Sequence, residues 1–416
     1  MSKNLKKPFL NKTRLVLYLS TFPQLSETFL VSKFSGLQAR GWDVHILCSH
    51  FNKTAWHKFP ALSHELKTKK RVHSTWPTQP RWLAIPLFLP ALMMCFIQAP
   101  RRIWQYFRLG WSRFGWGIFK KFYLAAALIP LKPDILHFEF GSLAVGRTYL
   151  KELLGTKLSV SFRGYDLNYI GLEKPDYYNQ VWEKVDAAHL LGEDLWRRAQ
   201  HRGAPEDLPH ALIPPAVDLL RFPENQTKCE KEIGTLTRHL RVLSVGRLHW
   251  KKGYEFSLQA VRRLVDQGFC LEYRIIGDGD YQDALYFARH QLNLEDEITF
   301  IGGLPHDKVL DNLQWADIFL HGAVSEGFCN AVLEAQAMGV PVVCTDADGL
   351  PENVADGITG FIVPRRDPTA MADKLATLAG NGELRQKMGA AGSQRVEAHF
   401  RMDQQLDAFE DFYESL

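Results

Sequence analysis

Cysteine is scarce in this sequence, and its placement does not suggest a metal site or a disulfide framework. Six cysteines are spread over 416 residues, and no two of them form a Cys-x-x-Cys pair. This usage argues against a disulfide-stapled domain and a zinc ribbon, and it fits a reducing compartment. The basic residues 1–14 are followed by an apolar run of only five residues, 15–19. That run is too short for the core of a signal peptide, so we expect no export and a cytoplasmic location.

Acidic residues are absent from a long stretch of the first half. Residues 66–133 contain no Asp or Glu, but they contain twelve Lys or Arg and five Trp. The apolar run at 83–97 includes Pro86 and Pro90 and is shorter than the ~20 residues of a membrane-spanning helix. Basic residues interleaved with aromatic ones favour a peripheral segment on an anionic membrane surface. A buried helical hairpin, a re-entrant or spanning segment, and a nucleic-acid groove are the alternatives, although no nucleic-acid-binding motif accompanies the charge.

The chain is too long for a single core, and its pattern predicts two α/β domains. Residues 14–48 read as strand, loop, helix and strand, which is the opening of a doubly wound sheet. A polar stretch at 223–238 has no periodicity and is interpreted as the linker. Strands and helices alternate again after it. We therefore expect domains at 1–222 and 223–395, followed by a C-terminal helix within 396–416.

One stretch of the second half, residues 325–339, combines a short apolar helix with a glycine-containing loop. Gly339 ends the helix, and Gly327 before it lets the backbone come close to a ligand. The amides of the first turn form an anion site, with Glu326 at its mouth and Glu334 about two turns deeper. This pattern suits a diphosphate between two polyhydroxy rings, as in a nucleotide-sugar. Alternatively, Glu326 is a first-turn acid favoured by the helix dipole, and Glu334 is a solvated residue.

Two cations precede that stretch at the start of the second sheet. Arg247 follows a predicted strand at 241–245, and Lys252 lies just before a predicted helix at 254–267. A guanidinium can fork onto two phosphate oxygens, while an ammonium acts as a point charge. The pair therefore predicts a diphosphate clamp; the alternative is two surface cations that flank a turn.

Three stretches together resemble the signature of glycosyltransferase family 4 (group 1), whose members are retaining enzymes of the GT-B fold. They are the Glu326-x7-Glu334 motif, the segment Val-Gly-Arg-Leu-His-Trp-Lys-Lys-Gly at 245–253, and the glycine-containing segments at 349–352 and 356–364. The resemblance covers roughly residues 240–395. It implies two Rossmann-like domains that face a deep cleft. The first would bind the acceptor, the second would bind the nucleotide-sugar, and the final helix would pack back on the first.

The resemblance also implies roles for individual residues. Glu326 would contact the donor sugar, and Glu334 would accept hydrogen bonds from the ribose. Arg163 stands where the family usually has a His near the transferred sugar; it cannot act as a base, but it could hold a phosphate or a hydroxyl. The remaining donor-side candidates are Arg247, Lys252, Gly327, Phe328, Asn330, Gly302 and Leu304. The acceptor-side candidates are Glu27, Thr28, His137 and Asp166.

The resemblance implies a retaining hexosyltransferase, and the basic, aromatic segment suggests a lipid-linked or membrane-held acceptor, as in bacterial exopolysaccharide or lipopolysaccharide assembly. The cations would stabilise the departing nucleoside diphosphate, so we expect neither a metal ion nor another cofactor. The expected partners are a nucleotide-diphosphate sugar, a lipid-linked glycan acceptor and the inner face of the cytoplasmic membrane, with no nucleic acid. A nucleotide-sugar epimerase or phosphorylase on the same fold is one alternative. The other is a membrane-bound sensor or scaffold without activity, which the Arg163 replacement suggests.

Overall fold

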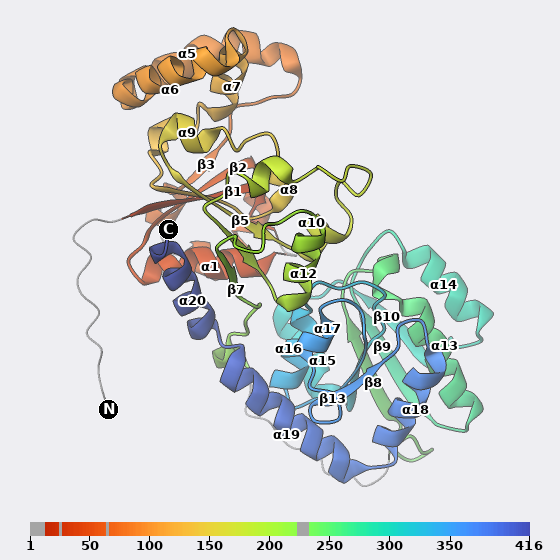
Figure 1. Ribbon diagram of the computed structural model, residues 1–416. Coiled ribbons are helices and arrows are strands. Elements are labelled where there is room, and N and C mark those ends of the chain that lie inside the picture. Colours follow the sequence, from red (N-terminus) through yellow and green to blue (C-terminus); the bar gives the residue numbers. More distant parts are fainter. Residues whose placement is uncertain (1–12, 25–26, 64–65, 223–232) are drawn as a thin grey trace, which may run out of the picture. The chain divides into compact units, whose positions relative to one another are not determined.

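The computed structural model describes residues 13–24, 27–63, 66–222 and 233–416 (Figure 1). The chain forms two compact units. The first comprises the described residues up to Leu190 together with Trp196–Ile213 and Leu406–Leu416, and the second comprises Leu191–Leu195 and the described part of Pro214–Gln405. The second unit therefore begins ahead of the expected boundary at residue 222. The predicted linker lies outside the described residues over 223–232, as does the basic N-terminus over 1–12.

The first unit is built on a parallel sheet of seven strands in the order β3-β2-β1-β4-β5-β6-β7. The inner strand β1 has five consecutive buried residues, because a parallel sheet is covered on both faces. Its strands are β1 Arg14–Phe22, β2 Asp43–Phe51, β3 Val72–Ser74, β4 Ile135–Phe138, β5 Lys157–Phe162, β6 Ala187–Leu190 and β7 His210–Leu212. Its helices up to the middle of the unit are α1 Thr28–Ala39, α2 Lys53–Trp56, α3 Pro60–Ser63, α4 Leu66–Lys69, η1 Arg81–Leu83, α5 Ala84–Gln98, α6 Pro100–Phe114, α7 Gly117–Ala125 and η2 Ile129–Leu131. The following ones are α8 Gly141–Ala144, α9 Leu150–Leu154, α10 Gly164–Asn168, α11 Asn179–Trp182 and α12 Glu193–His201.

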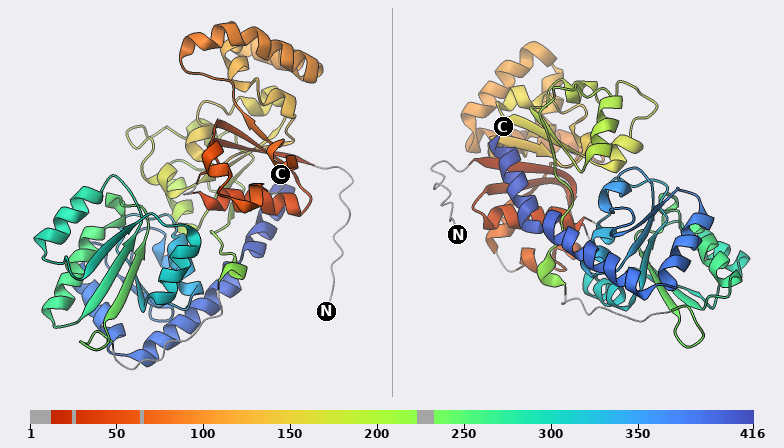
Figure 2. Two further views of the ribbon diagram at one scale, coloured as in Figure 1. Left: turned by 180° about the vertical axis from the view of Figure 1, so that it is seen from behind. Right: turned by 60° about the horizontal axis from the view of Figure 1, so that its bottom comes forward.

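The last helix, α20 Met402–Glu414, lies beside α1 (Figures 1 and 2). Leu406 occupies the space that a side chain at Gly36 would fill, so the two helices approach closely. Arg40 of α1 pairs with Asp407 and Glu410 of α20, at 2.6 Å each. From Leu406 onward the helix therefore completes the first unit.

The second unit has a parallel sheet of six strands in the order β10-β9-β8-β11-β12-β13. Its strands are β8 Leu240–Val245, β9 Leu271–Ile276, β10 Ile298–Gly302, β11 Ile318–His321, β12 Val342–Thr345 and β13 Gly360–Val363. Its helices are η3 Leu219–Arg221, η4 Trp250–Lys252, α13 Tyr254–Asp266, α14 Gln282–Gln291, α15 His306–Trp315, α16 Asn330–Ala337, α17 Leu350–Asn353, α18 Pro368–Ala379 and α19 Gly382–His399. Buried clusters pack between the sheet and these helices. Two parallel α/β sheets confirm the predicted fold class.

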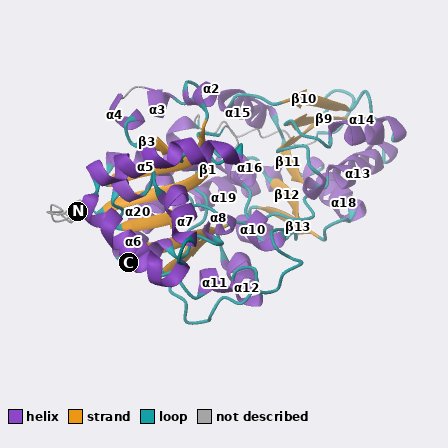
Figure 3. Cartoon of the chain, turned by 90° about the horizontal axis from the view of Figure 1, so that it is seen from above, coloured by secondary structure: helices purple, strands orange, loops and turns teal. Residues whose placement is uncertain are grey.

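Within the acid-free segment of the first unit, residues 84–125 form three helices, α5, α6 and α7, that pack on one another. Seen from above, α5 and α6 lie over the first sheet (Figure 3). Phe88 of α5 packs edge-on against Phe119 and Phe122 of α7. The apolar run that the sequence places at 83–97 is therefore a helix with one docked face.

Candidate functional site

The loop after β8 places two lysines against the end of β11. The short helix η4 carries Lys251 and Lys252, and it ends at Gly253 with φ +58°. A side chain at Gly253 would collide with the carbonyl of Gly322, so only glycine allows this close approach. The amides of Val324 and Ser325 then donate to the Lys251 carbonyl, at 2.8 and 3.2 Å. The glycine thus joins the first predicted motif to the second.

Lys252 and Glu326 form an ion pair that is largely shielded from solvent. The ammonium donates to the carboxylate, and each side chain is 12 % exposed. Burial alone would lower the pKa of Lys252, but the adjacent Glu326 carboxylate raises it above its usual range. Burial alone would raise the pKa of Glu326, but Lys252 and His321 hold it well below its usual range. Both groups are therefore charged at neutral pH, and the two predicted donor contacts are brought together.

The backbone around Glu326 is fixed by Asp348, which sequence reasoning missed. The Asp348 carboxylate accepts from the Ser325 hydroxyl at 2.6 Å and from the Glu326 amide at 3.1 Å. The Glu326 carbonyl accepts from the Gly349 amide at 2.9 Å. The only sequence signal is an Asp-x-Asp pattern at 346–348, directly after β12. In the structure, both of its carboxylates pair with Arg365, so the pattern holds the loop in place.

Two backbone amides lie just ahead of α16 without an acceptor in the described part of the protein. Its N-cap residue, Cys329, is held by Asn353, which accepts from the Cys329 amide at 3.2 Å and donates to its carbonyl at 3.0 Å. Within the described ranges, the amides of Gly327 and Phe328 donate to no protein acceptor. Asn330 is the first helical residue. Unpaired amides ahead of a helix of this length form a site for an anion.

Arg247 lies in the loop after β8 and is exposed. Among the residues that the structure describes, its guanidinium has no hydrogen-bond or ion-pair partner. It is close enough to act on the pKa of Lys252, which it lowers by charge repulsion. In the part of the chain that is described, a guanidinium without a protein partner, the ammonium of the Lys252–Glu326 pair and two unpaired amides are thus the groups that could hold an anion.

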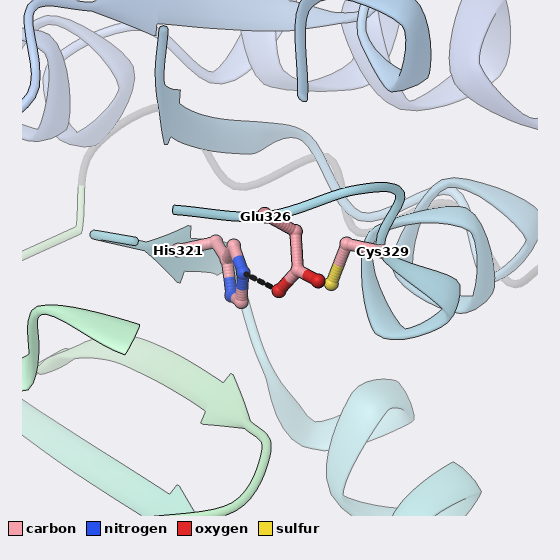
Figure 4. A group of neighbouring side chains, drawn as sticks. All are labelled: His321, Glu326 and Cys329. Atoms are coloured by element: carbon pink, nitrogen blue, oxygen red, sulfur yellow. Dashed lines mark ion pairs between the residues drawn. The ribbon is translucent and has the colours of Figure 1, made fainter. Parts of the chain in front are cut away.

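Three groups that could ligate a metal meet beside the ion pair (Figure 4). His321 ends β11, and its Nε2 lies 3.5 Å from Glu326 Oε2; the ligand atoms of His321, Glu326 and Cys329 all lie within 4.8 Å of one another. Burial alone would raise the pKa of Cys329, but His321 and Lys252 lower it. These are the ligand types that zinc takes. The Lys252 ammonium, however, already neutralises the Glu326 carboxylate. The sequence motifs single out neither His321 nor Cys329 as a ligand.

Glu334 lies further along α16 and is paired as well. His306, the first residue of α15, contacts Glu334 Oε1 at 3.1 Å. This hydrogen bond raises the pKa of His306. In the described part of the chain, the other carboxylate oxygen has no protein partner. Gly302 ends β10 with φ +82°, and Leu304, two residues later, is half-buried.

The His306–Glu334 pair gives a pH prediction. Because the folded protein holds the His306 proton more tightly, the pair contributes stability that is fully present below pH about 6.5. The contribution is lost as the pH rises through the raised pKa. Glu334→Gln is expected to move the pKa of His306 down towards its usual value, as measured by NMR titration of the imidazole. Glu295→Gln, at the exposed His290 pair, serves as the control and should leave His306 unchanged. An equal His306 pKa in wild type and Glu334→Gln would show that the pair does not form in solution.

In the first unit, Arg163 belongs to a charge cluster centred on Glu139. The fully buried Glu139 carboxylate pairs with Arg163 at 3.1 Å and with Lys33 at 2.7 Å. The Arg163 guanidinium also lies 4.1 Å from the centroid of the Phe29 ring. Burial lowers the pKa of Lys33 to about 8, although Glu139 opposes this shift. Arg163 is thus held by a carboxylate and an aromatic ring.

The structure corrects two predicted acceptor contacts. His137 is fully buried in β4, and both of its ring nitrogens contact serine hydroxyls of β5 at 2.8 Å. Asp166 is also fully buried, and it accepts from the amides of Ser142 at 2.9 Å and Arg163 at 3.2 Å. Both residues hold the first unit together and do not reach its surface. Glu27, which contacts Gln24, and Thr28, which is exposed at the start of α1, stay predictions.

Comparisons with known proteins agree with the geometry of the second unit. Residues 226–395 match the family model "Glycosyl transferases group 1". WcaL of Salmonella typhimurium, provisionally named a colanic acid biosynthesis glycosyltransferase, is 30% identical over 383 residues, which cover 86% of this chain and 89% of WcaL. The amylovoran biosynthesis glycosyltransferase AmsK of Erwinia amylovora is 32% identical over 269 residues, 62% of this chain and 64% of AmsK. Among solved structures, Anabaena HepE in complex with UDP-glucose superposes with a TM-score of 0.71 at 15% identity, over 97% of this chain and 100% of HepE.

Proposed function

The chain belongs to the group 1 glycosyl transferases, and on this basis we propose that it moves a sugar from a nucleoside-diphosphate sugar to a lipid-linked or membrane-associated glycan. The observation that carries the proposal is the anion site at the start of α16. We propose that the Arg247 guanidinium, the Lys252 ammonium and the amides of Gly327 and Phe328 converge there on one anion. A diphosphate is the part of the donor that fits this charge and these donors.

The diphosphate is also the leaving group, so the same contacts serve catalysis. As the bond between the sugar and the phosphate oxygen breaks, negative charge develops on that oxygen. Preorganised cations and amides stabilise this charge in the transition state. Arg247 forks onto two phosphate oxygens, and Lys252 supplies a second charge. On binding, the phosphate competes with Glu326 for Lys252, which leaves the Glu326 carboxylate to accept hydrogen bonds from the sugar.

We propose transfer with retention of the anomeric configuration, as the resemblance to family 4 implies. In this scheme the acceptor oxygen forms its bond on the face that the nucleoside diphosphate leaves. The acceptor proton goes to the departing phosphate, so no protein base is needed. Arg163 in place of the usual histidine is compatible with that scheme, because an arginine holds an oxygen without taking its proton. The anomeric coupling constant of the product by NMR reports the configuration.

We further propose that the reaction needs no metal ion, because two cationic side chains supply the positive charge. Excess EDTA is expected to change the transfer rate by less than about twofold, since the charge that stabilises the leaving group belongs to the chain. The check is the initial rate before and after chelation, followed by addition of Mg²⁺ or Mn²⁺. Loss of most activity in EDTA with recovery in Mg²⁺ would show that a metal carries the diphosphate.

The acceptor is proposed from the relatives and from the first unit together. WcaL and AmsK are named for the biosynthesis of colanic acid and amylovoran, which supports a role in exopolysaccharide assembly. Lipopolysaccharide assembly also uses lipid-linked glycan acceptors and is the alternative role. The basic and aromatic helices α5 to α7 suit work at the inner face of the cytoplasmic membrane. A growing glycan held by a lipid at that surface is the acceptor we propose.

The test is a donor screen followed by a transfer assay. A nucleotide-sugar that binds the native protein raises its melting temperature. That donor, labelled in the sugar, is then incubated with and without a membrane extract. Label that enters the lipid fraction only with the extract supports the proposal. Turnover of the donor without the extract would indicate an epimerase. Release of a sugar phosphate when inorganic phosphate is added would indicate a phosphorylase. Binding of the donor without any turnover would indicate a scaffold.

A further inference from the structure

We propose that the outer face of α5, with the neighbouring cations of α6, docks the first unit onto an anionic lipid leaflet without spanning it. The outer face of α5 is defined by five apolar side chains, each 56–79 % exposed: Ile85, Leu89, Met93, Phe96 and Ile97. They recur every three or four residues, so they lie on one side of the helix. No charged residue interrupts this face.

Such a face is unusual on a protein surface. Soluble proteins rarely expose a continuous row of large apolar side chains without using it for contact. The opposite side of α5 is well packed, since Ala91 and Cys95 are fully buried and the Cys95 thiol donates to the Ala126 carbonyl at 3.1 Å. The packing of this opposite side holds α5 in place, so its outer face stays exposed on a well-packed helix.

The next helix supplies the chemistry of a membrane interface. Trp104, Arg108 and Trp111 follow one another at helical spacing on α6, and all three are exposed. The Arg108 guanidinium lies 4.8 Å from the centroid of the Trp104 ring. Together with Phe107 they line a hollow of about 440 Å³. Indole rings lie at the boundary of water and hydrocarbon, where an arginine meets lipid phosphates.

Charge decides which partner fits this surface. Neither α5, α6 nor α7 contains an acidic residue, whereas Arg101, Arg108 and Lys120 are exposed on them. A protein partner would have to be apolar and acidic at matching positions. An anionic bilayer offers both properties over its whole surface, with hydrocarbon beneath phosphates. The bilayer is therefore the occupant that the pattern favours.

The same helix does not fit a membrane-spanning role. The segment Arg81–Gln98 has the composition and the minimum length of a span, and only 11% of it is buried. Its 18 residues reach about 27 Å along a helix, less than the ~30 Å hydrocarbon core. Spanning would also pull Phe88 away from Phe119 and Phe122 and expose Cys95. The packing therefore keeps α5 parallel to the surface on which it lies.

The test is co-sedimentation of the full-length protein with vesicles. Binding to phosphatidylglycerol-containing vesicles is expected to exceed binding to phosphatidylcholine vesicles by about tenfold or more and to fall as salt is added. The triple variant Leu89→Ser, Phe96→Ser and Ile97→Ser is expected to lower vesicle affinity by at least about tenfold. The matched control is Phe287→Ser on α14, a side chain that is 64 % exposed. It should bind vesicles as the wild type does.

Each other outcome overturns the proposal. If the triple variant binds vesicles as tightly as the wild type does, the outer face of α5 does not insert. If the wild type binds neutral and anionic vesicles equally, the cations do not contribute to binding. Resistance of the vesicle-bound protein to alkaline carbonate would indicate a spanning helix. Association with a protein and not with lipid would identify another occupant. The melting-temperature rise with a nucleotide-sugar is read in parallel, because it belongs to the second unit; its loss would count against the proposed function, not against docking.

Discussion

Replacing Lys252 with methionine is expected to lower kcat/KM for sugar transfer by about 10²–10³-fold, with little change in the fold. The ammonium is one of two cationic side chains in the anion site, and it is the buried one. Loss of one preorganised donor to a developing oxyanion has effects of this size in other enzymes, because the surrounding site excludes water. Methionine keeps most of the volume, so the variant tests charge and not packing. The measurement is the initial rate with the donor that the screen identifies.

A double variant separates catalysis from stability in that experiment. Lys252→Met alone leaves the Glu326 carboxylate buried without its counter-charge, which destabilises the native state. Lys252→Met with Glu326→Gln removes both charges and should unfold at a temperature closer to that of the wild type. Its transfer rate should stay at least as low as that of the single variant. Recovery of activity in the double variant would show that the loss came from the unpaired carboxylate, and the proposed role of Lys252 would be wrong.

The motifs of the second unit could be predicted from the sequence because their chemistry is local. A strand, a glycine turn and the start of a helix lie within a few residues of one another, and so do Arg247 and Lys252. The ion pair between Lys252 and Glu326 could not be predicted in the same way. It depends on the parallel neighbours β8 and β11, which bring the two loops to one edge of the sheet. For the same reason Asp348 and His321 were missed, because folding brings them to the site from other strands. Cys329 lies within the Glu326-x7-Glu334 motif, but the motif itself gives it no role.

His137 and Asp166 show the opposite case, in which the sequence suggests a ligand contact but the folded chain buries the side chain. His137 lies near the end of β4, and Asp166 lies in α10, which follows β5. α/β proteins bind ligands at that edge of the sheet, which makes both residues candidate contacts, although a lone histidine within a strand is more often a core residue. Whether such a side chain faces solvent or the core depends on what covers the sheet. Here β5 supplies two serine hydroxyls to His137, and α20 lays the Tyr413 ring 5.4 Å from its imidazole. A helix more than two hundred residues further along the chain decides the burial of β4.

The charge cluster around Glu139 is expected to give the largest effect on stability. Glu139→Gln removes the carboxylate that pairs with both Lys33 and Arg163. Lys33 is 2 % exposed, so its ammonium would be left in the core without a counter-charge. Removing one partner of a buried pair costs about 3–5 kcal/mol. For a unit of this size, that corresponds to a fall of roughly 10 °C in melting temperature.

The order of the variants tests the geometry more sharply than one value does. Lys33→Met should cost less than Glu139→Gln, because Arg163 still neutralises the carboxylate at 3.1 Å. Combining Lys33→Met with Glu139→Gln should recover part of the loss, since neither buried charge then remains. The control is Asp407→Asn, at the more exposed Arg40 pair, which should change the free energy of unfolding by less than about 1 kcal/mol. Thermal and urea unfolding of the full chain measure all four variants. If Glu139→Gln has the same melting temperature as the wild type, Lys33 does not carry a buried charge. The account of how Arg163 is held must then be abandoned.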